Sequence, residues 1–199
     1  MVGDILSADA TVTLADAWEE AQQAAGCRVD GKHRSKPLPL VHLWEDEWRR
    51  RSAIVRSRLL AMLGRSRRHF ARKLTVRRID QATLELFLVE HHLWGPTQAR
   101  FRYGLFEEHA QEQLAEPSLI AVASFSARRN VNRGGVPFRS HELIRFASRR
   151  GESVVGGLSK LIAAFRREMA PDDIVTVVDR NWGAGAGWET LGFEQVQRM

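Results

Sequence analysis

The stretch at residues 141–193 constrains the fold more than any other part of the chain, because strand-like and helix-like patterns alternate there. An apolar run at residues 143–147 predicts a short buried strand. Apolar residues at helical spacing over residues 158–169 predict a helix, and the β-branched residues 174–178 predict a second strand. Two nearly uncharged strands joined by a helix are expected to run parallel, with both faces covered. The chain is therefore expected to adopt an α/β fold.

Two glycines, Gly156 and Gly157, directly precede this predicted helix. Glycines let a ligand approach the backbone, and the first amides of a helix lack intrahelical partners, so the site is suited to a pyrophosphate or another anion. Ser159 can donate a hydrogen bond to such a phosphate. In the alternative interpretation the glycines only let the helix pack closely on a strand.

The same stretch ends in the sequence WETLGF at residues 188–193. A strand, a glycine turn, a helix and a strand followed by such a segment resembles the Gcn5-related N-acetyltransferase (GNAT) fold. The segments ELIRFAS (142–148), VVGGLSKL (154–161) and VVDRNW (177–182) resemble a phage branch of that fold. This branch occurs behind homing-endonuclease domains of the very-short-patch-repair type, and it is distantly similar to Mom-like DNA-modification proteins.

The resemblance covers roughly residue 71 to the C-terminus and implies a GNAT-like α/β (α+β) domain, with a mixed sheet and flanking helices. It implies acetyl-CoA or another acyl-CoA as the cofactor. The cofactor-binding residues that it indicates are Val155, Gly156, Gly157 and Ser159.

His92 and Asp179 are the candidate catalytic residues. In Mom-like proteins a histidine after the first helix of the fold lies at the reaction centre, and His92 stands at that place. Asp179 follows the second predicted parallel strand, where open α/β sheets bind ligands. Structural roles are also open, because a histidine is favourable at a helix C-terminus and Asp179 can cap the next helix. A His/Asp pair suits removal of a proton from an amine or binding of a metal ion, and the sequence leaves the metal question open.

Upstream patterns predict the rest of this domain. Alternation over residues 74–79 predicts its first strand, and Asp80 is expected to cap a helix whose apolar stripe is Leu84, Phe87, Leu88 and His91. Residues 101–106 and 119–125 predict two further strands. The basic segment 128–139 (RRNVNRGGVPFR) is expected to form a loop, as a flexible lid or a phosphate contact.

Positive charge is concentrated at residues 28–78, which hold 16 Lys and Arg against 4 Asp and Glu. The rest of the chain holds 14 against 20, so a basic segment precedes a mildly acidic domain. This distribution favours binding to a polyanion such as a nucleic acid, and the alternative interpretation is a solvated basic surface with no partner. The arginines expected to contact DNA lie on a helix predicted from residue 46 or 52 to 63: Arg49, Arg50, Arg51, Arg56 and Arg58.

Residues 40–64 resemble the end of the nuclease domain found in the same phage proteins. Only 39 residues precede them in this sequence, too few for the nuclease core. We therefore expect residues 1–70 to be a basic, truncated nuclease remnant and residues 71–199 to be the GNAT-like domain. Within the first part, residues 14–25 predict a short helix and residues 40–44 a short strand.

The only cysteine is Cys27, no stretch has membrane-spanning length, and the first residues lack the pattern of a signal peptide. A soluble protein of a reducing compartment, such as the cytoplasm, is expected. The sequence favours a phage-type acyltransferase-like domain that acts on or binds DNA. The alternatives are a catalytically silent DNA-binding remnant, which Trp188 in place of a common tyrosine favours, and an acetyltransferase of a small molecule or protein.

Overall fold

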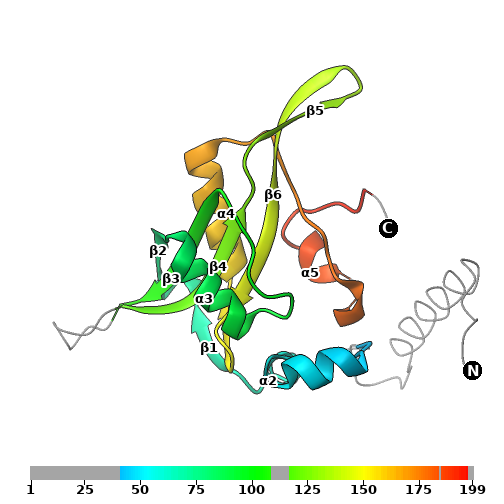
Figure 1. Ribbon diagram of the computed structural model, residues 1–199. Coiled ribbons are helices and arrows are strands. Elements are labelled where there is room, and N and C mark those ends of the chain that lie inside the picture. The colour runs from blue at the N-terminus through cyan, green and yellow to red at the C-terminus, as the bar shows by residue number, and fades with distance from the viewer. Residues whose placement is uncertain (1–40, 109–116, 184, 197–199) are drawn as a thin grey trace, which may run out of the picture. The chain divides into compact units, whose positions relative to one another are not determined.

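A computed structural model describes residues 41–108, 117–183 and 185–196 of the chain (Figure 1). The chain divides into two compact units. The first, here called the sheet unit, comprises Trp44–Val178 with Gln195–Met199. The second, the terminal unit, comprises Met1–Leu43 with Asp179–Glu194. The helix predicted at residues 14–25 lies outside the described residues.

The fold is mixed α/β, as the sequence predicts. The described residues form four α-helices, a mixed open sheet and a separate two-stranded parallel sheet. In chain order the sheet unit contains α2 (Glu45–Met62), β1 (Arg67–Phe70), β2 (Thr75–Arg78), α3 (Gln81–His91), β3 (Phe101–Glu107), β4 (Ser118–Phe125), β5 (Arg129–Arg133), β6 (Val136–Ser148), β7 (Glu152–Val155), α4 (Gly157–Met169) and β8 (Asp173–Val175).

The main sheet has the strand order β2-β3-β4-β6-β5, and β8 also pairs with β6. All of its pairings are antiparallel except that of β6 with β8, which is parallel, as expected for strands joined by a helix. β1 and β7 form the two-stranded parallel sheet, in which Phe70 pairs with Val155. Because β7 leads directly into α4, this small sheet holds the segment that precedes the helix.

Two helices cover the main sheet with apolar side chains. Leu84, Phe87 and Leu88 of α3 pack on Val122 of β4 and Ala147 of β6. Three members of the predicted stripe are therefore core residues, and Asp80 caps the helix by accepting from the Thr83 amide at 2.7 Å. Both predictions are confirmed.

α4 contributes Phe165 to a second aromatic cluster, formed with strands of the same sheet. Its ring stacks on that of Phe125 with centroids 4.0 Å apart and an interplanar angle of 3°. Phe101 and Tyr103 of β3 and His141 of β6 meet Phe165 edge to face. His141 is fully buried there, and its Nδ1 lies 3.0 Å from the Ser126 carbonyl, which identifies this nitrogen as the donor.

The prediction of a basic loop at residues 128–139 is wrong, because these residues form the hairpin β5–β6 (Figure 1). Its two-residue turn is Gly134-Gly135, with φ values of 60° and 87°, a turn geometry that matches strand twist. Three of its arginines face carboxylates: Arg129 with Glu142, Arg133 with Asp173, and Arg139 with Asp172.

The crossover strands also differ from expectation. β8 covers only residues 173–175, all three half-buried, so the second strand is shorter and less covered than the apolar run 174–178 predicts. The first strand, β6, extends well beyond residues 143–147, because its N-terminal half belongs to the hairpin. A turn at residues 150–151 separates β6 from β7, which begins at residue 152.

The terminal unit holds the 3₁₀ helix η2 (Arg180–Trp182) and the short helix α5 (Ala186–Glu189). The His42 amide donates to the Asn181 carbonyl at 2.8 Å, and the rings of Trp188 and Phe193 meet edge to face at 5.4 Å. Residues 41–44 form no strand, contrary to prediction. Among the described helices, none has the length and apolar character needed to cross a bilayer.

Candidate functional site

The start of α4 is the candidate cofactor site, and its two glycines play different structural roles. Gly156 is exposed and left-handed, with φ of 73°, and it precedes the helix without a side chain to cap it. Gly157 is buried, and a Cβ there would lie 2.9 Å from the Val154 side chain. Close packing of helix on strand therefore requires Gly157, while Gly156 supplies the turn.

The other cofactor candidates, Val155 and Ser159, are both exposed beside these glycines. The first turn of α4 carries no acidic residue. Lys160 does not point at this turn, because its Nζ donates to the Ala71 and Leu74 carbonyls at 2.8 and 2.5 Å. The open helix start is thus bordered by the segment after β1, and α4 is tied to that segment.

His92 stands just after the last residue of α3, as predicted for a histidine at a helix C-terminus. Its Nδ1 accepts a hydrogen bond from the Trp94 amide at 3.1 Å, and the two rings meet edge to face. Burial, together with the charges of Arg145 and Arg58, lowers the pKa of His92 to about 4. The ring is therefore neutral near pH 7.

His91, by contrast, belongs to the packing of α3. Its side chain is 8% exposed, and its ring meets that of Phe87 edge to face at 4.4 Å. The Arg150 amide lies 3.4 Å from its Nδ1, and burial lowers its pKa. His91 thus packs within the apolar stripe of α3 on which the sequence places it.

Asp179 lies in the terminal unit and caps η2, accepting from the Asn181 amide at 3.0 Å. The structural role that the sequence left open for it is thus realised. Asp179 does not directly end a strand, because β8 stops at Val175. His92 lies in the sheet unit, so the meeting of His92 with Asp179 stays a prediction.

The five predicted DNA-binding arginines are on α2, but they face different surroundings. Arg49 pairs with Glu45 at 2.6 Å on the helix surface, and Arg50 and Arg56 are exposed. Arg51, at a kink in the helix, donates to the Val89 carbonyl at 3.1 Å, and Arg58 lies near enough to His92 to lower its pKa. Three of the five arginines therefore face outward, and two face α3 and the residue that follows it.

Sequence reasoning missed a polar cluster around the buried His69 of β1. Its side chain is 4% exposed, and its Nδ1 and Nε2 each lie 3.2 Å from a carboxylate oxygen, of Glu107 in β3 and Glu152 in β7. No local pattern marks this cluster, because its members come from three distant strands. It ties the two-stranded sheet to the main sheet.

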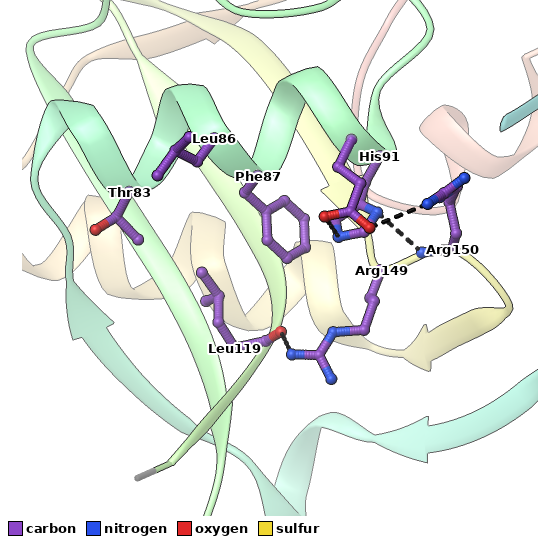
Figure 2. A pocket seen from close by; sticks show the side chains of 8 residues that line it. Thr83, Leu86, Phe87, His91, Leu119, Arg149 and Arg150 are labelled. Atoms are coloured by element: carbon purple, nitrogen blue, oxygen red, sulfur yellow. Dashed lines mark hydrogen bonds and ion pairs between the residues drawn. The ribbon is translucent and has the colours of Figure 1, made fainter.

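A shallow open depression of about 600 Å³ was also missed (Figure 2). It lies beside α3 and is bordered by Phe87, Glu90 and His91, with Arg149 and Arg150 at its rim. Both arginines are held in place, Arg149 by the Leu119 carbonyl and Arg150 by Glu90. Its walls thus bring a mostly apolar surface next to two oriented cations.

The described residues contain no group of three or more His, Cys, Asp or Glu side chains that could hold a metal ion. Comparison of the chain with protein-family models, with curated proteins and with solved structures gave no match.

Proposed function

We propose that this chain is a GNAT-like acyltransferase domain that acts on or binds DNA and transfers an acyl-derived group to a nucleobase amine. The observation that supports it most is the arrangement around α4. β6 and β8 pair in parallel for only three residues, after which the Thr176 hydroxyl, not a backbone amide, donates to the Leu143 carbonyl. The two strands are joined through an uncapped helix start with a left-handed glycine.

The proposed cofactor is acetyl-CoA or another acyl-CoA, bound through its phosphates at the start of α4. The first amides of the helix and the positive end of its dipole favour an anion there. Val155, Gly156, Gly157 and Ser159 would line this contact, and only the backbone of the two glycines need take part. The absence of acidic side chains from the first turn supports the assignment.

The proposed transfer forms a bond from the amine nitrogen to the acyl-derived group and breaks that group's bond to the carrier, which leaves with the electron pair. The nitrogen must also lose a proton. A nucleobase amine is a weak nucleophile because its lone pair is delocalised, so proximity alone does not suffice. His92 and Asp179 are the proposed catalytic residues. The Asp179 carboxylate can take up the proton or hold a metal ion, and His92, whose Nδ1 accepts from the Trp94 amide, can donate a hydrogen bond to the reacting groups.

DNA binding is proposed for the outward arginines of α2. Their surroundings support Arg50 and Arg56, which are exposed, over Arg51 and Arg58, which face α3 and His92. Exposed arginines contact phosphates independently of sequence, and each lost contact reduces the slope of log affinity against log salt by roughly 0.9. Arg50→Gln with Arg56→Gln should therefore flatten this slope by up to about two units.

A catalytically silent DNA-binding domain is the second candidate, and two contacts favour it. Asp179 already serves as a cap, and Gly157 is required for packing whether or not a cofactor binds. The two candidates differ in one measurement, the mass spectrum of nucleosides from DNA of cells that express the protein. The leading proposal expects a modified nucleoside, lost by about 100-fold or more in His92→Ala and Asp179→Asn.

Cofactor binding is tested separately by thermal unfolding. Millimolar acetyl-CoA or CoA should raise the melting temperature, because a ligand that binds the folded state stabilises it. No shift with either compound would reject the cofactor assignment. No modified nucleoside together with a flattened salt slope in the Arg50/Arg56 variant would favour the silent DNA-binding domain.

A further inference from the structure

The chain after α3 brings together three side chains whose chemistry differs from that of a base. His92, Trp94 and Arg145 of β6 form a contiguous group, with the rings of His92 and Trp94 6.1 Å apart and the Arg145 guanidinium 5.0 Å from the Trp94 ring. Arg58 of α2 acts on the same histidine through its charge. All four belong to the sheet unit.

The hydrogen bond at Nδ1 decides the tautomer of His92. A backbone amide can only donate, so Nδ1 must accept from Trp94, and the single proton of the neutral ring must lie on Nε2. Nε2 has no hydrogen-bond partner among the described residues. It is also not one of their solvent-inaccessible polar atoms that lack a partner. His92 therefore presents an accessible N–H donor and no free lone pair.

This tautomer argues against two roles that a histidine commonly has. A general base or a metal ligand needs a free nitrogen lone pair, and the only one on this ring is occupied by the Trp94 amide. The pKa of about 4 keeps the ring in this neutral form near pH 7, and the neighbouring arginines would also repel a metal cation.

Arg145 is a cation without a carboxylate partner within ion-pair distance among the described residues. Its Nη1 donates to the neighbouring Ile144 carbonyl at 2.8 Å, and its Nε is sealed from solvent with no partner. Burial lowers its pKa, while Glu142 acts in the opposite direction from a distance. A half-buried guanidinium of this kind lacks the anion that normally compensates it.

We propose that the Nε2–H of His92 and the guanidinium of Arg145 bind a phosphate group, with Trp94 holding both side chains in place. Two donors of this type match the oxygens of a phosphate, and the positive surroundings favour its charge. The source of this phosphate group rests on the proposed function, which makes it a DNA strand. A phosphate of the cofactor is the other source with the same chemistry.

The decisive experiment is a titration of the whole protein with inorganic phosphate, followed by nitrogen-15 NMR of the histidine rings. Before phosphate is added, the spectrum should show His92 as the Nε2–H tautomer. The Nε2–H signal should then shift with phosphate. Arg145→Gln should weaken phosphate binding by about tenfold or more, as expected when a charged hydrogen bond is lost. Arg167→Gln, which removes an exposed arginine from α4, should leave the affinity within about twofold.

His92→Gln provides a second variant that retains an N–H donor, and His92→Ala removes the donor. The alanine variant should lose more phosphate affinity than the glutamine variant. Equal affinity in wild type, His92→Ala and Arg145→Gln would overturn the proposal, as would a His92 ring with its proton on Nδ1. Near-ultraviolet circular dichroism of each variant identifies any that fails to fold, and the tautomer measurement on wild type then still decides.

Two further titrations distinguish the sources and separate this inference from the proposed function. A short single-stranded oligonucleotide that displaces phosphate identifies a DNA strand as the source, and CoA that displaces it identifies the cofactor. If the His92 signal responds to phosphate but no nucleoside is modified, the site stands and the acyltransferase proposal fails. If DNA is modified while phosphate leaves the His92 signal unchanged, the acyltransferase proposal stands and the phosphate site fails.

Discussion

The two long helices that cover the main sheet begin in opposite ways. α3 starts behind Asp80, whose carboxylate accepts from the Thr83 amide. α4 starts behind Gly156, which has no side chain, and the segment before it is held by the two-stranded sheet of β1 and β7. The start of α3 is thus satisfied by a neighbour in sequence, whereas the start of α4 is placed by distant strands and keeps its amides uncapped by a side chain. An uncapped but well-supported helix start is the arrangement that can receive an anion.

The largest effect on this contrast is expected from His69→Leu. The change leaves Glu107 and Glu152 without the ring that lies between them, and leaving a buried polar group without its partner costs up to about 3 kcal/mol of unfolding free energy. Urea unfolding measures it, and hydrogen exchange in residues 152–155 should rise. Arg67→Gln, which removes only an exposed partner of Glu107, should cost about 0.5 kcal/mol or less. Similar losses in both variants would contradict a buried support behind α4.

Gly157→Ala should have the next largest effect. The added Cβ would stand 2.9 Å from Val154 and 3.4 Å from Leu105, and such overpacking costs roughly 1–3 kcal/mol. Gly187 of α5 is the matched control, because a Cβ there meets nothing within 4 Å. Gly187→Ala should be neutral or stabilise the protein, since alanine favours helix. A neutral Gly157→Ala would show that this glycine is not needed for packing.

Asp80→Ala should lower the melting temperature by roughly 2–4 °C, as expected for a lost N-cap, and Asp80→Asn should retain most of the wild-type stability. The hydrogen bonds to Thr83 lower the pKa of Asp80 below its ordinary value. The folded state therefore binds the proton less readily than the unfolded state, so the contribution is present above the ordinary pKa. It is lost as pH falls through the folded pKa. The difference in unfolding free energy between wild type and Asp80→Ala should therefore shrink in acid. The difference between Asp80→Asn and Asp80→Ala should not.

The smallest expected effect is the difference between Gly156→Ala and Gly64→Ala. Both glycines have φ of 73°, and neither Cβ would meet an atom closer than 3.7 Å. Each change should cost about 1–2 kcal/mol for left-handed backbone, so their difference should be small. Acetyl-CoA sharpens the comparison, because its stabilising effect should weaken only in Gly156→Ala. An equal response of the two variants to acetyl-CoA would place the cofactor elsewhere.

The parts of the fold predicted correctly depend on local patterns. The cap at Asp80, the stripe on α3 and the helix α4 all follow from residues within a few positions of one another. The hairpin at residues 129–140 also has a local signal, since Gly134-Gly135 matches a two-residue turn, but its basic composition favoured a loop. The glycine pair therefore indicated the hairpin correctly, and the basic composition wrongly indicated a loop.

Other features had no local signal. The pairing of β1 with β7 joins residues far apart in the chain, and the charged sequence of Arg67–Phe70 does not alternate like a strand. The division of the α2 arginines into outward and inward sets depends on what the helix packs against. For His92, the residue type indicated a candidate base, and only the folded contact with the Trp94 amide two residues along the chain assigned the proton to Nε2.

The sequence by itself determined the mixed α/β class, the extents of α3 and α4 and the parallel crossover through α4, because hydrophobic periodicity and capping residues act over short distances. Tertiary structure alone decided which glycine is needed for packing, which arginines remain exposed and which nitrogen of His92 carries the proton. The exposure of the arginines depends on atoms brought together from distant segments. The glycine and histidine contacts, to Val154 and to the Trp94 amide, join near neighbours whose placement only the folded backbone fixes. His92 combines both, since its place after α3 is local, while its charge state is decided by burial and by the arginines of α2 and β6.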